Sequence, residues 1–345
     1  MDILTPYSGK SMVLDATLLS NIMKCSRLTN FKHNLNLTPM TGKGNSLEIG
    51  SIIHKFLEVY YKSQKNGIAR QSAFGFGMSA AELYIAGCPH CTNFIPLDCH
   101  ECVKGLFHDV VTDTHVKCPY CNGTGQVKTS CGHPPNEYPG LDNTPSETDG
   151  YIIGWKYALD TCEQYHKHYF NDFWVTLDTE IVKSRIMYQD DEIRILFKSK
   201  LDWIVDTNNG IYPCDHKTMK QNRDTLSLNN QFMGQCLQLD TTKVIINKVG
   251  LQKTLKPEDK FKRVPISYSS ERLLEWQSEI LPYWCKQYLV WNEQGYFPPN
   301  FNSCENKFGK CEFYNVCESN PAMREEELRN TFKVGETWNP QNSEE

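Results

Sequence analysis

Two acidic residues and a lysine form the most chemically suggestive group in this 345-residue chain. Asp202 and Asp215 are thirteen residues apart, and Lys217 follows the second acid by two positions. Apolar residues flank them and an Asn-Asn-Gly turn signal lies at 208–210, so the stretch predicts two strands joined by a turn. Because side chains alternate along a strand, Asp215 and Lys217 share a face and His216 points away. Carboxylates are hard ligands for Mg²⁺ or Mn²⁺, and a nearby lysine can hold a water or phosphate, which predicts a phosphodiester-cleaving site.

The surrounding motifs resemble one superfamily of nucleases. Asp215-His216-Lys217 looks like the D-x-K element of the PD-(D/E)XK nucleases, and the whole set is most similar to their RecB-like branch. Gly50-Ser-Ile-Ile-His54 resembles the upstream histidine motif of that branch. Gln231-Phe-Met-Gly-Gln235 stands where the branch carries Gln-x-x-x-Tyr, with Gln235 in place of the tyrosine. The resemblance covers nearly the whole chain apart from an insert and the tail, and it implies a restriction-endonuclease-like core, a mixed central β-sheet flanked by helices.

The same resemblance implies a role for each side chain. His54, Asp202 and Asp215 would bind one or two Mg²⁺ or Mn²⁺ ions. Lys217 would position or activate the attacking water, and Gln231 would orient Lys217 or the phosphate. The implied activity is a metal-dependent deoxyribonuclease, with exonuclease action on ends or single strands favoured over sequence-specific cutting.

Two further residues near this group have more than one interpretation. His54 and Glu58 lie at the margin of an apolar helical stripe, which by itself indicates a boundary histidine and a surface glutamate. The resemblance instead makes His54 a ligand and Glu58 its supporting neighbour. Glu180 stands on a predicted strand upstream, either as an additional acid near the metal or as a solvated strand residue.

The fifteen cysteines indicate metal binding. Many occur as C-x-x-C pairs, the spacing that chelates a single ion, and the N-terminus lacks the basic and apolar regions of a signal peptide. Thiolate-bound metal in a cytoplasmic protein is therefore expected rather than disulfides. The small size and the mosaic of metal sites suggest a phage-encoded enzyme, acting in the host cytoplasm.

An insert over residues 86–135 carries the first group of cysteines. Its candidate zinc ligands are Cys88, Cys91, Cys99, Cys102, Cys118, Cys121, Cys131 and His133. The inner four cysteines have a zinc-ribbon spacing, and the outer four ligands would form a second site by nesting. One closed site with unused cysteines is the alternative. The run at 121–125 resembles one repeat of the DnaJ-type zinc domain, and structural zinc, in one or two sites, is expected to hold this segment together.

The second group lies near the C-terminus. Cys304, Cys311 and Cys317 cannot close a four-ligand site alone, and Cys25 in the first predicted helix is the natural fourth ligand. AddB-like and CRISPR-associated RecB-like nucleases carry such a set, so the resemblance implies a [4Fe–4S] cluster joining the two ends of the chain. Zinc in the same Cys₄ site is the alternative.

The apolar content of 39% is sufficient for one large α/β core. We expect helices at 16–26, 47–65, 152–172, 225–240 and 270–294, and strands at 173–188, 193–206, 210–217 and 242–249. The expected segments are 1–85 (N-terminal helices of the core), 86–135 (zinc insert), 136–303 (nuclease core), 304–320 (cysteine cluster) and 321–345 (acidic, disordered tail).

Charge and hydropathy bear on the partners. The net charge of −5 does not describe a DNA-facing surface, because acids at a metal site and in the tail lower the total. Basic runs over 183–223 and 253–263 would either follow a phosphate backbone or form a solvated face. No apolar run reaches the ~20 residues of a membrane span. Besides DNA, recombination or replication proteins are the expected partners. The alternative function is an inactive, zinc-dependent nucleic-acid- or protein-binding factor on a nuclease scaffold.

Overall fold

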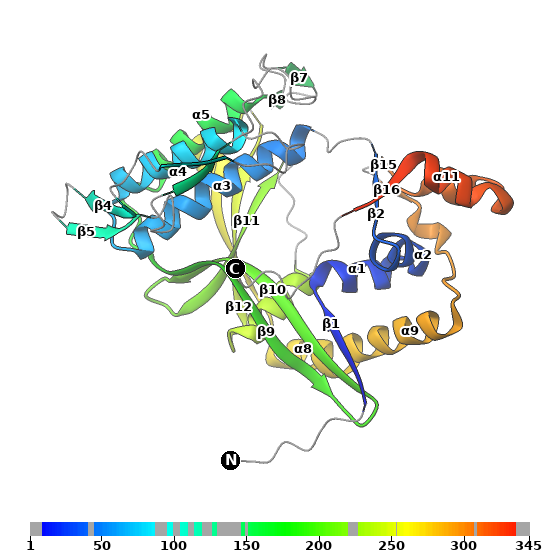
Figure 1. Cartoon of the computed structure of the whole chain (residues 1–345). Helices are drawn as coiled ribbons and strands as arrows, with labels where there is room; N and C mark the ends of the chain where they lie inside the picture. Colours follow the sequence, from blue (N-terminus) through cyan, green and yellow to red (C-terminus); the bar gives the residue numbers. More distant parts are fainter. Residues whose placement is uncertain are drawn as a thin grey trace.

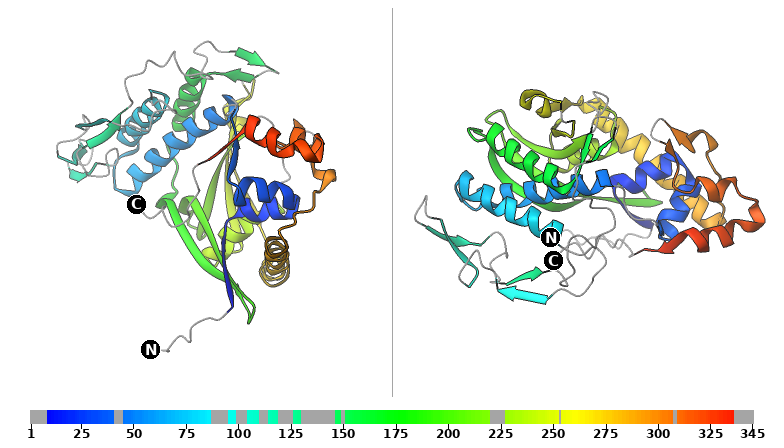
Figure 2. Two further views of the ribbon diagram at one scale, coloured as in Figure 1. Left: turned by 45° about the vertical axis from the view of Figure 1, so that its right-hand side comes forward. Right: turned by 90° about the horizontal axis from the view of Figure 1, so that it is seen from above.

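The chain folds around a mixed central β-sheet with helices on both faces, as the computed structural model shows (Figures 1 and 2). The structure describes residues 9–40, 45–86, 95–98, 104–109, 114–118, 126–129, 146–148, 151–219, 227–252, 254–306 and 309–335. The expected mixed α/β architecture is therefore confirmed. Among the described residues, no helix combines the length and apolar character needed to cross a membrane.

The central sheet has the order β1-β10-β11-β12-β13, with β9 beside β10. β1 runs parallel to β10 and β11 parallel to β12, whereas the remaining neighbours are antiparallel. Its strands are β1 (Lys10–Leu14), β9 (Val175–Gln189), β10 (Ile193–Asp206), β11 (Ile211–Met219), β12 (Lys243–Gly250) and β13 (Phe261–Ser267). The strands expected at 173–188, 193–206, 210–217 and 242–249 correspond to β9–β12, whereas β1 and β13 were not predicted.

Two hydrophobic cores lie on the two faces of this sheet. On one face, α3, α4 and α5 pack over Trp203, Ile245 and Phe261. On the other, α1, α6, α8 and α9 pack over Phe197 and Ile246. The helices are α1 (Ala16–Lys24), α3 (Asn45–Lys65), α4 (Arg70–Ala86), α5 (Trp155–His168), α6 (Asn230–Gln238), α8 (Ser270–Glu275) and α9 (Leu281–Gln294).

Helix α4 was not anticipated, and the other helices differ from expectation mainly at their ends. A π-helical turn, η3 (Trp276–Ile280), joins α8 to α9 in the long helix expected around Pro282. Gly77 explains how α4 lies so close to α3, because a Cβ at this position would stand 2.8 Å from the Phe56 ring. α5 begins at Trp155 rather than 152 because residues 151–153 form a strand, β8.

Strands β10 and β11 separate close to Asp202 and Asp215, the two acids expected to form the site. Their pairing runs only from Trp203 opposite Cys214 to Asp206 opposite Ile211. From Cys214 onwards β11 pairs with β12, while β10 remains paired with β9. On its other side β10 pairs with β1 only up to Phe197. Within the part of the sheet that the structure describes, residues 198–202 therefore have a strand partner on one side only, which leaves room for helical side chains.

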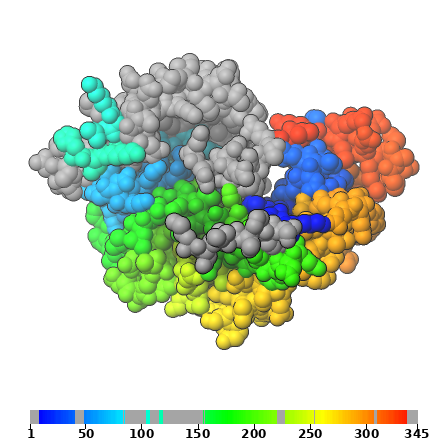
Figure 3. All heavy atoms as spheres, turned by 60° about the horizontal axis from the view of Figure 1, so that its bottom comes forward, coloured from blue at the N-terminus to red at the C-terminus, as the bar shows by residue number. Residues whose placement is uncertain are grey.

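The N-terminal helices and the C-terminal segment up to residue 335 lie side by side (Figure 3, blue beside orange and red). β2 (Leu37–Pro39) pairs with β16 (Phe332–Val334), and Phe313 stacks on Phe332 with ring centroids 4.4 Å apart. Between Phe313 and β16 the chain forms the helices α10 (Tyr314–Glu318), η5 (Pro321–Met323) and α11 (Arg324–Thr331). The expectation of a disordered tail was wrong for 321–335, because the buried Phe332 and a strand pair anchor this acidic segment. Residues 336–345 lie outside the described part.

The insert is described only in pieces. Its hairpin strands are β3 (Ile95–Asp98) with β6 (Gln126–Thr129), and β4 (Leu106–Asp109) with β5 (Thr114–Lys117), followed by β7 (Ser146–Thr148) with β8 (Tyr151–Ile153). Of the eight expected zinc ligands only Cys118 is described, and it is buried. The other seven lie outside the described residues, so the zinc sites stay a prediction. The remaining short elements are α2 (Ser26–Thr29), η1 (Asn30–Asn34), α7 (Pro257–Lys260), η4 (Phe301–Ser303), β14 (Glu305–Asn306) and β15 (Gly309–Lys310).

Candidate active site

Asp202 stands at the point where β10 and β11 separate. Its Oδ2 accepts the main-chain N–H of His216 at 2.9 Å, and its side chain is 16% exposed. Burial, then the nearby carboxylates of Asp215 and Glu180, raise the pKa of Asp202 well above its usual value. The fold thus holds several carboxyl groups close together in a poorly hydrated place, an arrangement that a cation would relieve.

Asp215 is completely buried and is held by α6. The Asn229 side chain caps α6 by accepting the N–H of Gln231. Gln231 therefore lies in the first turn of this helix. Gln231 Nε2 donates to Asp215 Oδ1 at 2.6 Å, and Gln235 Nε2 makes a longer contact of 3.4 Å to the same oxygen. Gln235, which replaces the tyrosine of the RecB-like pattern, thus points at the same carboxylate.

Lys217 completes a closed triangle with Asp215 and Gln231. Its Nζ lies 2.6 Å from Asp215 Oδ2 and donates to Gln231 Oε1 at 3.3 Å. The contact with the buried Oδ2 is an ion pair. The expectation that Asp215 and Lys217 share a face of the strand is confirmed.

His54 approaches from the opposite side, on α3. Its Nδ1 lies 4.0 Å from Asp202 Oδ2, and burial lowers the pKa of its imidazole, which favours the neutral form that binds metals. Gly50, one turn earlier, lets α3 come this close, because a Cβ there would stand 2.8 Å from Thr218 Oγ1. The glycine of the Gly-Ser-Ile-Ile-His run therefore has a packing reason.

His216 points to the other face of β11, as predicted. Its ring lies beside the stacked pair of Tyr61 and Trp203, with centroid distances of 5.8 and 5.9 Å. Its Nδ1 lies 2.8 Å from the amide nitrogen of Asn247, and burial lowers its pKa well below the usual value. The neutral ring is thus fixed in the core, and the backbone of His216 is what faces the site.

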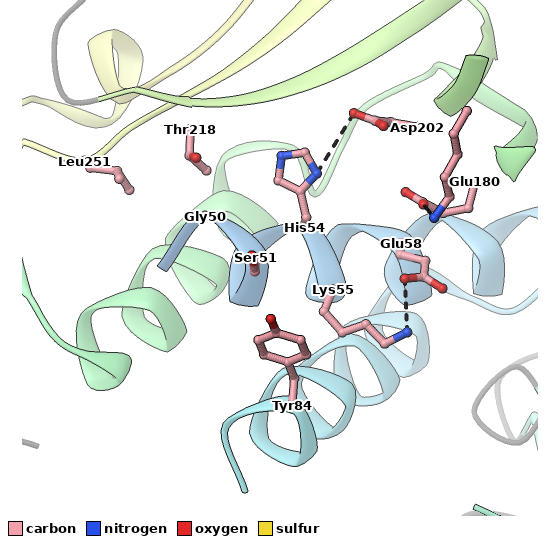
Figure 4. A pocket seen from close by; sticks show the side chains of 11 residues that line it. Gly50, Ser51, His54, Lys55, Glu58, Tyr84, Glu180, Asp202, Thr218 and Leu251 are labelled. Carbon is pink, nitrogen blue, oxygen red and sulfur yellow. Dashed lines mark hydrogen bonds and ion pairs between the residues drawn. The ribbon is translucent and has the colours of Figure 1, made fainter. Parts of the chain in front are cut away.

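A cavity of about 640 Å³ opens in front of His54 and Asp202, whereas Asp215, Lys217 and Gln231 are not among its lining residues (Figure 4). His54 and Asp202 face each other along one wall, while Tyr84 reaches into it from α4. The lining groups that ionise are His54, Lys55, Glu58, Tyr84, Glu180, Lys200 and Asp202. The cavity is large enough for a nucleotide as well as a metal ion.

Glu180 does line this cavity. It has a left-handed φ of 53°, a strained conformation for a glutamate, next to an irregular part of the β9–β10 pairing. Its carboxylate pairs with the ammonium group of Lys200, and burial raises its pKa. The interpretation as a merely solvated strand residue is therefore wrong, because the side chain is largely buried beside the other acids.

Several residues of the cavity were not foreseen as parts of the site: Ser51, Lys55, Tyr84, Thr218 and Leu251. Ser51 and Lys55 lie on α3 with His54, and Lys55 pairs with Glu58 at 3.0 Å. A signal existed for Ser51, because it precedes His54 by three residues and so shares its face of the helix. Tyr84 gave no such signal, because it belongs to α4, which the sequence pattern did not reveal.

These groups fit a divalent cation by their chemistry. The buried Asp215 and largely buried Asp202 supply the carboxylate oxygens that Mg²⁺ and Mn²⁺ take in proteins, and the neutral imidazole of His54 could add a nitrogen ligand. With the side chains in these positions, no three His, Cys, Asp or Glu residues in the described ranges lie close enough together to bind one metal ion. The contacts of Lys217 and Gln231 with Asp215 show what the carboxylate binds instead.

The four cysteines predicted to share a ligand site line a common cavity between the N-terminal helices and the C-terminal segment, although, as they stand, no three of them are close enough to hold one ion. Cys25, Cys304, Cys311 and Cys317 line one small cavity beside Leu28, Phe31 and Phe313. Burial, then the other three thiols, raise the pKa of Cys304. All four are free thiols.

The long interval between Cys304 and Cys311 also has a structural explanation. The β14–β15 hairpin occupies it and reverses the chain, so that the N–H of Cys311 donates to the carbonyl of Cys304 at 2.7 Å. Thus six intervening residues still bring the two thiols to the same cavity. Cys162, Cys214, Cys236 and Cys285 are instead buried in the two cores, as expected of ordinary thiols.

In comparisons with known proteins, no family model matches this chain and no curated protein matches its sequence.

Proposed function

We propose that the protein is a metal-dependent deoxyribonuclease of the RecB-like group, with a restriction-endonuclease-like core. One observation carries the proposal. Residues from α3, β10, β11 and α6 converge where β10 and β11 separate, and they are the same residues that the nuclease pattern singles out. The closed triangle of Asp215, Lys217 and Gln231, with Asp202 and His54 facing the cavity, is its centre.

Each residue has a role that follows from its contacts. His54, Asp202 and Asp215 would hold Mg²⁺ or Mn²⁺, which lowers the pKa of a bound water and offsets charge on the reacting phosphate. Lys217 is placed to hold the attacking water or the phosphate, because its ammonium group is half-buried yet directed by two acceptors. Gln231 orients both the lysine and the carboxylate.

The outer part of the cavity suits a nucleic-acid backbone. Lys55 and Lys200 line it, and each forms an ion pair with a glutamate of the cavity. A phosphate that bound these lysines would replace the glutamates as their partner. Glu180 and Glu58 are then additional acids close to the metal. We infer action on DNA ends or single strands in recombination or replication, within the cytoplasm.

The cysteine groups complete the proposal. Cys25, Cys304, Cys311 and Cys317 would hold a [4Fe–4S] cluster, or zinc in its place, because four free thiols share a cavity with apolar walls. Such a group would fasten the C-terminal segment to the N-terminal helices. The insert would carry one or two structural zinc ions.

The test compares the wild-type protein, purified without oxygen, with Lys217→Ala and with the exposed-lysine control Lys333→Ala. End-labelled linear and circular DNA, single- and double-stranded, is incubated with Mg²⁺, Mn²⁺ or EDTA. We expect metal-dependent cutting by the wild type and the control, and a loss of at least about 100-fold in Lys217→Ala. Absence of cutting by folded, metal-loaded protein that still binds DNA would favour the inactive binding factor.

A further inference from the structure

A second cavity lies far from the candidate active site. It encloses about 380 Å³, and Tyr212 and Lys243, at the starts of β11 and β12, form part of its lining. The first cavity is lined by Thr218 and Leu251, at the other ends of the same two strands. Six residues separate Tyr212 from Thr218, so the two cavities are about 20 Å apart along β11.

Aromatic rings form the walls of this second cavity. Phe173 and Trp174, just before β9, line it together with Tyr212. Tyr212 is held in place because its hydroxyl donates to the carbonyl of Asn209 at 2.7 Å. Phe173 is 65% exposed, so most of its surface is open to a ligand.

Arg263 makes the Trp174 wall rigid. The centre of its guanidinium group lies 4.1 Å from the Trp174 ring and 3.9 Å from the Tyr169 ring. Its Nη1 lies 2.5 Å from Asp172 Oδ2, and its Nη2 donates to the Tyr61 hydroxyl at 3.1 Å. The side chain is therefore fixed and its charge is balanced, so the cavity keeps its shape without a ligand.

The charge at the rim comes from Lys243. Its ammonium nitrogen lies 5.9 Å from the Tyr212 ring centroid, and none of the described lining residues is acidic. Flat aromatic walls stack on a nucleobase of any sequence, and a nearby ammonium group pairs with phosphate. The volume lies within the range of small-ligand sites. An aromatic side chain of a protein partner would stack on the aromatic walls but would have no phosphate to pair with Lys243.

We propose that this cavity is a nucleotide-binding site, in which Phe173, Trp174 and Tyr212 stack on the base and Lys243 contacts the phosphate. The nucleotide is either a free mononucleotide or one unit of a nucleic-acid strand. Binding there requires no catalysis, so the proposal stands apart from the proposed nuclease activity.

The experiment is calorimetric titration of the whole protein in buffer without added Mg²⁺ or Mn²⁺ and without chelator, so that its proposed zinc and cluster stay in place. The probes are 2′-deoxyadenosine 5′-monophosphate, 2′-deoxyadenosine, inorganic phosphate and N-acetylphenylalaninamide. The variants are Phe173→Ser and Lys243→Gln. The controls are Phe170→Ser, an exposed aromatic of the same loop that does not line the cavity, and Lys333→Gln.

We expect saturable binding of the monophosphate, weaker binding of the nucleoside and none of phosphate alone. Phe173→Ser should weaken the monophosphate and the nucleoside alike, at least about fivefold. Lys243→Gln should weaken only the monophosphate, and the controls should match the wild type. Tighter binding of a (dT)₆ oligonucleotide than of the thymidine monophosphate would identify a strand as the source, and equal binding a free nucleotide.

Two results would overturn the proposal. One is monophosphate binding that is absent, or unchanged in both variants. The other is tighter binding of N-acetylphenylalaninamide than of the monophosphate, which would indicate a protein partner. Wild-type cleavage of DNA is measured separately with Mg²⁺, so failure here leaves the nuclease proposal standing.

Discussion

The main-chain N–H of His216 donates to the carboxylate of Asp202 at 2.9 Å, across the point where β11 leaves β10. This bond ties the middle residue of the D-x-K element to the acid thirteen positions before Asp215. Because the His216 ring is buried beside the stacked pair of Tyr61 and Trp203, the donor has little freedom to move. The geometry of the site is therefore set by the hydrophobic core behind it.

The carboxylate of Asp202 should make stability depend on pH. Its pKa is raised in the folded state above the value of about 3.9 in an unfolded chain, first by burial and then by Asp215. Between these two pKa values the folded protein holds a proton that the unfolded chain has released. The free energy of unfolding should thus fall as pH rises through that interval.

Asp202→Asn removes this titration while keeping an oxygen for the His216 N–H. Urea unfolding at pH 5, 6 and 7 without added Mg²⁺ or Mn²⁺ should show a shallower fall of the free energy of unfolding in the variant than in the wild type. Adding Mg²⁺ at pH 7 should then stabilise the wild type and leave the variant unchanged, because a bound ligand stabilises only the state that binds it. Identical pH slopes in the two proteins would refute this account.

Gly50 should be indispensable to the approach of α3. A Cβ at this position meets Thr218 Oγ1 at 2.8 Å, whereas the next Thr218 atom is 3.9 Å away. We expect Gly50→Ala to shift His54 and reduce cleavage about tenfold or more. Thr218→Ala, which removes the obstructing hydroxyl, should restore most of the activity in the double variant.

Gly75→Ala is the matched control, because nothing lies within 4 Å of the added methyl group. It should leave cleavage unchanged and stabilise α4 by about 0.5–1 kcal/mol, as measured by urea unfolding. Equal activity of Gly50→Ala and Gly75→Ala would show that the close approach of α3 is not required.

The two glutamines of α6 should differ in importance. Gln231 donates to Asp215 at 2.6 Å and also accepts from Lys217, whereas Gln235 makes only the 3.4 Å contact. Gln231→Leu should lower kcat by about 10- to 100-fold, and Gln235→Leu by clearly less. Steady-state cleavage at saturating Mg²⁺ measures both, and the reverse order would contradict the assigned geometry.

The four-cysteine cavity should bind metal through all four thiols. Cys25→Ser is expected to lose the iron or zinc of this site. Cys285→Ser should retain it, because Cys285 is buried on α9, in the hydrophobic core with Phe197 and Ile246. Elemental analysis with assay of acid-labile sulfide distinguishes a cluster from zinc. Cys25→Ser should also make the C-terminal segment easier to cleave with protease, since its attachment to the N-terminal helices is weakened. Unchanged metal content would remove Cys25 from the site.

The strands that carry the site could be predicted because their signals are local. Alternating apolar residues and an Asn-Asn-Gly turn mark β10 and β11, and a regular apolar stripe marks α3. The spacing of Asp202, Asp215 and Lys217 then placed the chemistry, since strand alternation fixes which side chains meet.

The elements that were missed depend on distant contacts. β13 contains Pro265 and several charges, which argue against a strand, yet it is the edge strand where proline is tolerated. Its Arg263 is buried only because Asp172, from another segment, pairs with it. α4 has no regular apolar stripe, because it is packed on several sides, so Tyr84 could not be assigned to the site in advance.

The position of Cys25 has a consequence for biosynthesis. About 280 residues separate it from Cys304, so at ordinary rates of translation Cys25 leaves the ribosome roughly 15–55 s before its partners. During that interval the thiol has no companions with which to hold a metal. The central sheet, whose last strand ends at Ser267, is synthesised before Cys304, Cys311 and Cys317. If the four thiols hold a metal as proposed, all four can bind it only after that point, and a chain terminated before Cys304 would contain His54, Asp202, Asp215 and Lys217 but lack the cysteines of the C-terminal segment.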